Sequence, residues 1–259
     1  MISKKALRSA VLVAAASAGM ALVAGNAMGQ ESPDSRRFTK DFRFADCDFT
    51  SGGENMYFRL RPGRLVLEAE EDGEVERIEI TVLRQFERLF VPGLGWVRTR
   101  VIEERETVDD ELVEVSRNFF AMCKETDDLV YFGEDVDIYH EDGSVTHEGA
   151  WRAGQPDGNG LAQPGILMPG RFLLGARYYQ ELADGIALDR AEHMDMGLVV
   201  TTKAGRFRDC VRIVETTPLE PGHESVKVYC RGIGLVLDGD AQLVEYDFGD
   251  DDDKEEEND

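Results

Sequence analysis

The 259-residue sequence is poor in basic residues, histidine, tryptophan and cysteine. It holds 29 Lys and Arg against 52 Asp and Glu, which gives a formal charge of −23. Such an acidic chain repels phosphates and anionic head groups, so we expect no nucleic-acid partner and no docking on an anionic membrane. After residue 24 no stretch approaches the ~18 consecutive apolar residues of a membrane helix, so we expect no stable membrane insertion of the mature chain.

Signatures of catalysis are also missing. The sequence contains no Gly-x-Ser-x-Gly, no Walker loop and no Gly-x-Gly-x-x-Gly fingerprint. No two cysteines lie within five residues of each other, which excludes a Cys-x-x-Cys zinc site. A pair of carboxylates for glycoside hydrolysis stays open, but acids are so abundant that no single pair stands out. We therefore assign no catalytic residue and favour a protein that is not an enzyme.

The N-terminus has the pattern of a secretory signal peptide, in which a basic head precedes an apolar run and small residues mark the cleavage site. These parts are Lys4, Lys5 and Arg8, residues 10–24, and Ala27 with Gly29. We predict a signal peptide over residues 1–29, with cleavage after Ala27 as the alternative. A membrane anchor is the competing interpretation, but the run is short and rich in Ala and Gly. Export predicts a periplasmic or secreted protein.

Four cysteines remain after cleavage, and an even number in an exported chain predicts disulfides. The segments around Cys210 and Cys230 form two predicted strands joined by "TTPLEPGH". If this hairpin folds about Glu220, the two cysteines face each other across the ladder, close enough for a bridge. A second bridge between Cys47 and Cys123 then follows by elimination.

Most of the chain alternates between apolar and polar residues, with a short polar turn every 8–12 residues. In residues 78–82, for example, the isoleucines and Val82 share one face and Glu79 and Thr81 the other. The pattern predicts an all-β, mainly antiparallel fold: a curved sheet, half-barrel or open barrel, with acids mostly facing solvent. The Gly- and Pro-rich residues 152–170 interrupt the alternation as a long crossover loop.

The predicted organisation is a single domain with irregular ends. Residues 30–46 are polar and are expected to be a loose N-terminal segment, and residues 47–247 form one β-rich domain. Residues 248–259 belong to an acidic stretch, "DFGDDDDKEEEND", that we expect to be disordered and solvated.

The acidic stretch from Gly133 to Trp151 is the strongest candidate for a metal site. With Asp142-Gly143 as a two-residue turn, His140 pairs with Val145 and Asp137 with Glu148. Asp135, Asp137 and Glu148 then share one face and could hold calcium through oxygen ligands, or be neutralised by a base such as Arg152. A solvated acidic face is the simpler interpretation. On the other face His140 and His147 could share a transition metal, with His193 or Glu192 as a third ligand, although hydrogen-bonded histidines are commoner.

Aromatic residues and methionines cluster around the Gly/Pro-rich loop. They could line a groove on the curved sheet for an apolar ligand, or fill the core. The predicted groove residues are Trp151, Met168, Phe172, Tyr178, Tyr179, Met194 and Met196.

Several segments between Tyr131 and Val236 resemble a group of uncharacterised exported bacterial proteins. The segments are "YFGEDVDIY", "HEGAWRAG", "PGILMPG", "GARYYQE", "ALDRAE", "ETTPLEPG" and "GIGLVL", and upstream "YFRLRPG" is similar to the "YFPLxPG" of that group. The resemblance implies an exported, β-rich domain with no assigned activity. The layout is also similar to lipoprotein-carrier folds of the LolA type, an analogy of fold alone.

These observations favour an exported binding or structural module for a lipid-like or peptide ligand. The alternatives are an exported hydrolase with a carboxylate or divalent-metal centre, and a calcium-dependent surface protein.

Overall fold

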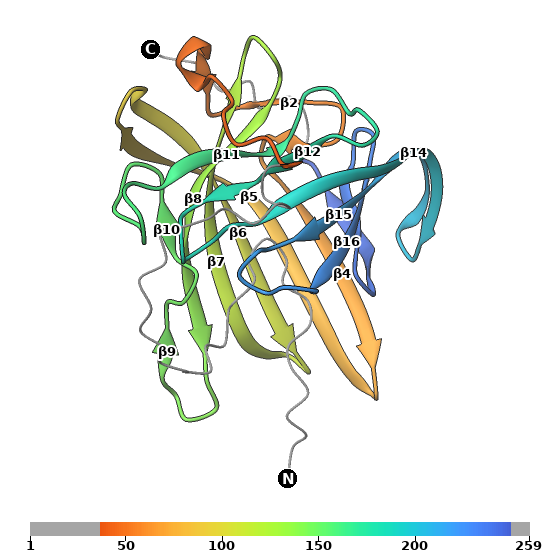
Figure 1. Cartoon of the computed structure of the whole chain (residues 1–259). Coiled ribbons are helices and arrows are strands. Elements are labelled where there is room, and N and C mark those ends of the chain that lie inside the picture. Colours follow the sequence, from red (N-terminus) through yellow and green to blue (C-terminus); the bar gives the residue numbers. More distant parts are fainter. Residues whose placement is uncertain (1–36, 250–259) are drawn as a thin grey trace.

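A computed structural model of the chain describes residues 37–249 (Figure 1). The predicted signal peptide and residues 250–259 of the predicted tail lie outside the described residues. Strands dominate the described range, which contains no α-helix; Phe44–Asp46 forms a short 3₁₀ turn. Between residues 37 and 249, therefore, no helix is long and apolar enough to cross a membrane.

The strands fall into long hairpins and short pieces. The long strands are β4 (Gly63–Glu71), β5 (Glu74–Val91), β6 (Gly95–Val108), β7 (Glu111–Cys123), β8 (Leu129–Tyr139), β14 (Arg190–Thr202) and β15 (Gly205–Thr216). Those of intermediate length are β11 (Gln163–Met168), β16 (Glu224–Cys230), β17 (Gly234–Asp238) and β18 (Ala241–Asp247). The short ones are β1 (Phe49–Thr50), β2 (Gly53–Glu54), β3 (Arg59–Leu60), β9 (Val145–Thr146), β10 (Trp151–Arg152), β12 (Arg177–Tyr179) and β13 (Glu181–Leu182).

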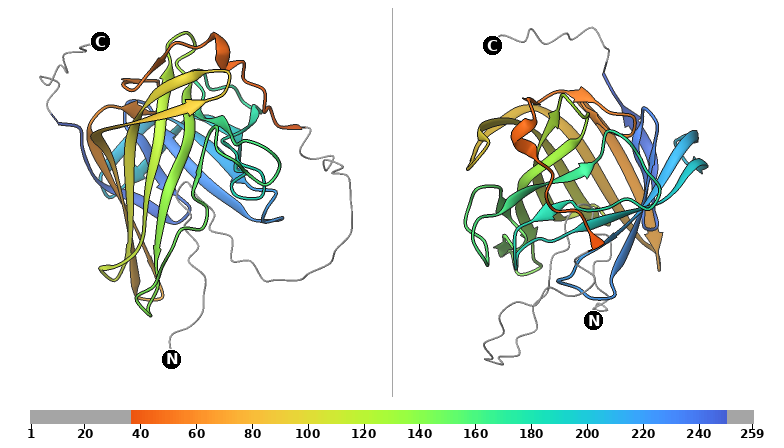
Figure 2. Two further views of the ribbon diagram at one scale, coloured as in Figure 1. Left: turned by 90° about the vertical axis from the view of Figure 1, so that its left-hand side faces the viewer. Right: turned by 45° about the horizontal axis from the view of Figure 1, so that its top comes forward.

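Nearly all strands belong to one antiparallel sheet, in the order β12-β14-β15-β16-β17-β18-β4-β5-β6-β7-β8-β11-β13. The sheet curls strongly, so that β14–β16 cross over the concave side of β5–β8 (Figures 1 and 2). Its two ends, β12 and β13, are separated along the chain by Gln180 alone. The sheet is not closed into a barrel, and the prediction of a curved, open antiparallel sheet is confirmed.

The β4–β5 hairpin shows how the alternation produces this fold. Ile78 and Ile80 are buried on the concave face, whereas Glu79 between them is half-exposed. The strands meet at Asp72-Gly73, and both residues have positive φ, as a two-residue hairpin turn requires. The Asp-Gly pair therefore sets the register that turns the isoleucines inward.

Both predicted disulfides are present. Cys210 lies directly opposite Cys230 in the β15–β16 ladder, and their sulfurs are bonded. Cys47 is bonded to Cys123, and Phe49 of β1 pairs with Cys123 at the end of β7. The second bridge thus holds the N-terminal segment against the sheet.

Two irregular segments are more ordered than their composition suggested. In the segment expected to be loose, Thr39 exchanges backbone hydrogen bonds with Arg177 and Tyr179, and Phe44 is buried. In the Gly/Pro-rich stretch, β11 pairs with both β8 and β13. A side chain at Gly165 would meet the backbone oxygen of Gln180 at 2.2 Å, so a glycine here allows the two ends of the sheet to approach.

The register predicted for the acidic hairpin is wrong by one residue. Tyr139, not His140, pairs with Val145, and Ile138 pairs with Thr146. The loop has three residues, because His140 N–H donates to Ser144 and Gly143 adopts the left-handed conformation (φ 81°). Gly143 thus occupies the bulge position that follows a tight turn, rather than the second position of a two-residue turn.

Candidate functional site

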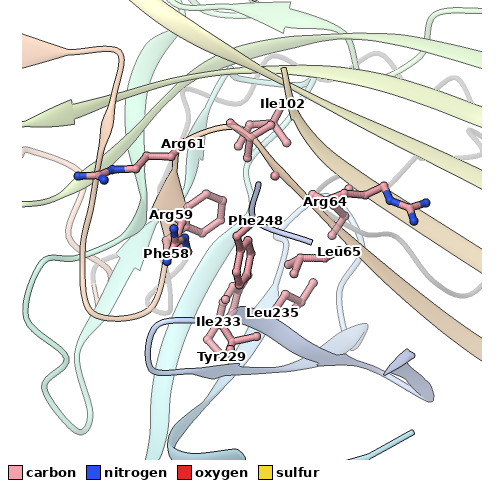
Figure 3. Close-up of a pocket in the computed structure, with 14 residues that line it drawn as sticks. Phe58, Arg59, Arg61, Arg64, Leu65, Ile102, Tyr229, Ile233, Leu235 and Phe248 are labelled. Atoms are coloured by element: carbon pink, nitrogen blue, oxygen red, sulfur yellow. The ribbon is translucent and has the colours of Figure 1, made fainter. Parts of the chain in front are cut away.

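An apolar pocket lies at one end of the curved sheet, between the start of β4, the end of β16 and the start of β17 (Figure 3). It contains about 570 Å³ of space free of protein atoms, including open solvent at its mouth. It is lined by Phe58, Arg59, Arg61, Gly63, Arg64, Leu65, Ile80, Val82, Ile102, Tyr229, Ile233, Gly234, Leu235 and Phe248. We call the four residues with buried side chains, Ile80, Ile102, Tyr229 and Leu235, the pocket floor.

The only charged residues that line this pocket are three arginines, although the chain has 52 acids. Arg59 lies over the ring of Phe248, 4.5 Å from its centroid. Arg64 is bound by Glu79 at 3.2 Å and also by Glu245. Arg61 is exposed, and Figure 3 shows it and Arg64 on opposite sides of the apolar residues, with their guanidinium groups turned outward. Arg59 also lies 3.8 Å from Glu54, so Arg59 and Arg64 both have acidic partners beside the pocket, while the guanidinium groups remain the only charged groups in its lining.

Phe248 borders the mouth, although the sequence placed it in the acidic tail. Its ring packs on Tyr246 at 5.4 Å as well as under Arg59. A side chain at Gly63 would meet the Phe248 ring and the Asp247 oxygen at 3.0 Å, so a glycine is needed where Phe248 crosses β4.

Beneath the pocket floor lies a cluster of ionisable groups that we call the interior acid network. It comprises Glu104, Glu106, Glu114, Glu134, Glu181, Asp189, Glu215, Asp238 and Lys227. All are buried except Asp189, which is half-buried. Glu106 and Glu114 are direct partners across β6 and β7, an unfavourable pair if both are charged.

The network has one cation. Lys227 Nζ lies 3.1 Å from Glu215 and 3.6 Å from Asp238. Neutral donors serve two of the carboxylates: Gln180 donates to Glu215, which Lys227 also contacts, at 2.7 Å, and Trp151 donates to Glu181 at 3.0 Å. Both carboxylate oxygens of Glu104, which is 2% exposed, lack a hydrogen-bond partner within the described part of the chain.

Burial raises the pKa of several of these acids. It raises the pKa of Glu114 to about 7, and burial together with Glu215 raises that of Asp189 to about 7. Burial and the neighbouring Glu106 raise the pKa of Glu104 well above its usual range, and burial and Glu114 do the same for Glu106. Although burial alone would lower it, Asp238 and Glu215 hold the pKa of Lys227 well above its ordinary value. At neutral pH the network therefore combines a charged lysine with an ionised Asp238 and with several glutamates, Glu104, Glu106, Glu134 and Glu181, whose raised pKa favours the protonated form.

Basic groups occupy the predicted calcium site. Arg152 binds Asp135 at 2.6 Å, as the sequence allowed, and Asp137 lies 3.4 Å from Arg117 and 3.0 Å from His147. Glu148 is exposed. Among residues 37–249, three or more potential metal ligands come together only at Cys47, Cys123 and Glu125, where both sulfurs form a disulfide. The three predicted carboxylates are thus not gathered into a site.

The histidines proposed as metal ligands have other partners. His140 Nε2 lies 2.9 Å from the Thr146 hydroxyl, and His147 Nδ1 lies 2.8 Å from the Val136 oxygen. His193 contacts Tyr178 and the Leu173 backbone, and Phe172 stacks on its ring at 3.8 Å. Burial lowers the pKa of His193 to about 4, so it is neutral at pH 7. Glu192 binds Arg177.

The predicted aromatic groove is divided between core and surface, and none of its seven residues lines the pocket. Trp151, Met168, Tyr178 and Tyr179 are buried, whereas Met194 and Met196 are 41% and 52% exposed. Phe172 is half-buried and covers His193. The pocket is formed by side chains from strands whose apolar and polar residues alternate in the usual way, so nothing in their sequence marked them as pocket residues. The cluster of three arginines in "FRLRPGR" was the available signal for the rim.

Comparison with known proteins gives no match: no family model, curated protein or solved structure is significantly similar to this chain.

Proposed function

We propose that the protein is an exported binding module for a single-chain amphiphile with an anionic head group. The observation that carries the proposal is the lining of the pocket, which is apolar inside, has arginines as its only charges and contains no acid. Apolar walls suit an acyl chain, and arginine guanidinium groups suit a carboxylate, sulfonate or phosphate.

Export is supported by the signal-peptide pattern and by two disulfides, which form and persist in oxidising compartments. A carrier for an amphiphile outside the cytoplasm also agrees with the layout analogy to lipoprotein carriers of the LolA type. The hydrolase alternative requires carboxylates that a substrate can reach, whereas the closely paired Glu106 and Glu114 are buried. The geometry thus favours binding over hydrolysis.

The test is calorimetric titration of the oxidised chain from residue 30 with two probes of equal tail length, decanesulfonate and decyltrimethylammonium, below their micelle concentrations. We expect decanesulfonate to bind at least about tenfold more tightly, a difference of about 1.4 kcal/mol. Replacing Arg59 and Arg61 with Gln should remove most of this preference without abolishing binding of the tail.

A second variant tests the location. Leu65→Trp fills the pocket and should abolish binding of both probes, whereas Leu173→Trp, at a 65% exposed leucine that does not line the pocket, should change neither. Absence of binding by the wild-type protein contradicts the proposal. Equal binding of both probes contradicts the role of the arginines.

A further inference from the structure

The interior acid network and the pocket share the same strands. Ile80 of the pocket floor is the direct partner of Glu104 across β5 and β6. Ile102 precedes Glu104 by two residues, and Tyr229 follows Lys227 by two, so each pair points to the same face of its strand. The floor is thus the neighbour of Glu104 and Lys227 on the same face of the sheet.

This arrangement is stable only while most of the acids are neutral. Seven buried carboxyl groups surround one buried ammonium group, and Glu104 has no donor to replace the water that it has lost. Removing these protons would place several negative charges between β6, β7, β16 and β17. Desolvated charges without partners cost several kcal/mol, so the strands must part or admit water to hydrate them.

We propose that the interior acid network is a proton-binding site that couples pH to occupancy of the pocket: protonation holds the floor closed and favours the ligand, and ionisation releases it. This inference rests on the proposed function. Because the affinities for proton and ligand are linked, a ligand that requires the closed floor must take up protons when it binds at slightly alkaline pH.

The groups that face the network belong to several elements. The members themselves lie on β6, β7, β8, β13, β15, β16 and β17 and in the loop before β14. The further titratable groups are Glu76 of β5, Tyr131 of β8, Tyr178 of β12, Tyr229 of β16 and Glu220 of the β15–β16 loop. Lys227 is the one cation among these described neighbours. His193 is neutral throughout the range used below. The carboxyl groups are therefore the proton acceptors.

The experiment measures the affinity for decanesulfonate at pH 6.5 and 8.5. The sulfonate keeps its charge over this range, so any change belongs to the protein. We expect binding to be several-fold weaker at pH 8.5, since one carboxyl group whose pKa moves by one unit can change the affinity by up to about tenfold. The variant E104Q/E106Q imitates the protonated network and should retain its affinity within about twofold. The control E70Q/E71Q, on exposed positions of β4, should follow the wild-type protein.

Equal affinity of the wild-type protein at both pH values overturns this inference and leaves the proposed function intact, whereas no binding at either pH overturns both. If E104Q/E106Q does not fold, a measurement on the wild-type protein alone tests the inference. Its binding enthalpy at pH 7.5 in phosphate and in Tris should differ, because these buffers release protons at different enthalpic cost. Identical enthalpies mean no proton uptake and overturn the inference.

Discussion

At the scale of single residues, Lys227 is a buried lysine held between two carboxylates. It is fully buried, and its ammonium group lies within 4 Å of both Glu215 and Asp238. A buried ion pair adds little over an apolar pair of the same shape, but the loss of one partner leaves a buried charge uncompensated. The main contribution of Lys227 to stability is therefore that it compensates the buried negative charge of its carboxylate partners.

Replacing Lys227 with Met should lower the free energy of unfolding by about 3 kcal/mol at pH 8. The loss should be clearly smaller at pH 5.5, because the pKa of Asp238, raised by burial to about 6, lets this carboxyl group take up a proton. Urea unfolding at the two pH values measures both quantities. Lys203→Met, at an exposed lysine, should show neither effect. Equal losses at the two pH values would contradict the assigned ionisation states.

Gly133 illustrates a different constraint, imposed by backbone contact. A side chain here would meet the Trp151 oxygen at 2.2 Å in the β8–β10 pair, and φ is 122°. Gly133→Ala should cost more than about 1 kcal/mol of unfolding free energy. The matched control is Gly143→Ala, which has positive φ but no atom within 4 Å, so it should cost less. Equal costs in thermal or urea unfolding would rule out the contact as the cause.

At the scale of secondary-structure elements, the two disulfides close loops of very different length. Cys210–Cys230 joins neighbouring strands 20 residues apart, whereas Cys47–Cys123 joins the N-terminal segment to β7 across 76 residues. The longer loop restricts the unfolded chain more, and loop-closure entropy gives about 4.5 kcal/mol for it against about 3 for the shorter one.

We therefore expect the double replacement Cys47→Ala/Cys123→Ala to lower the midpoint of urea unfolding more than Cys210→Ala/Cys230→Ala does. Thermal or urea unfolding of the two variants, each with its other bridge oxidised, measures the difference. The reverse order would show that strain or residual structure in the unfolded chain outweighs loop entropy.

At the scale of the whole molecule, the interior acid network gives stability an unusual pH dependence. The pKa values of Glu114 and Asp189 rise to about 7 on folding, mainly through burial, from the ordinary range near 4. Between about pH 4 and pH 7 these two groups bind more protons in the folded protein than in the unfolded chain. The free energy of unfolding therefore falls as the pH rises. His193 opposes this trend only below about pH 6.5, because burial lowers its pKa.

The melting temperature should therefore fall between pH 6.5 and 8.5, a range in which exposed carboxyl groups are ionised in both states. Unfolding in urea at pH 7 should also release protons, which a pH electrode or indicator dye detects. E104Q/E106Q should flatten the profile, and E70Q/E71Q should not. A melting temperature that stays constant or rises over this range would show that the buried acids are already ionised in the native protein.

The sequence alone determined the β class, the antiparallel pairing and the Cys210–Cys230 bridge, because these depend on local alternation and turn residues, and Cys47–Cys123 then followed by elimination. Ile78, Ile80 and the Asp72-Gly73 turn are an example, since each signal lies within a few residues. The prediction of the register of the acidic hairpin was wrong, because Asp-Gly occurs both in two-residue turns and in longer turns with a bulge.

Only the tertiary structure decided the site. In sequence, Glu104 and Glu106 continue the alternation of Ile102 and are equivalent to acids that face solvent. They become a buried network because the sheet curls until β15–β17 meet the concave face of β6 and β7, which brings Lys227 and Asp238 to them from more than 120 residues away. Curvature of this kind arises from twist and bulges summed over many strands, and no short segment encodes it.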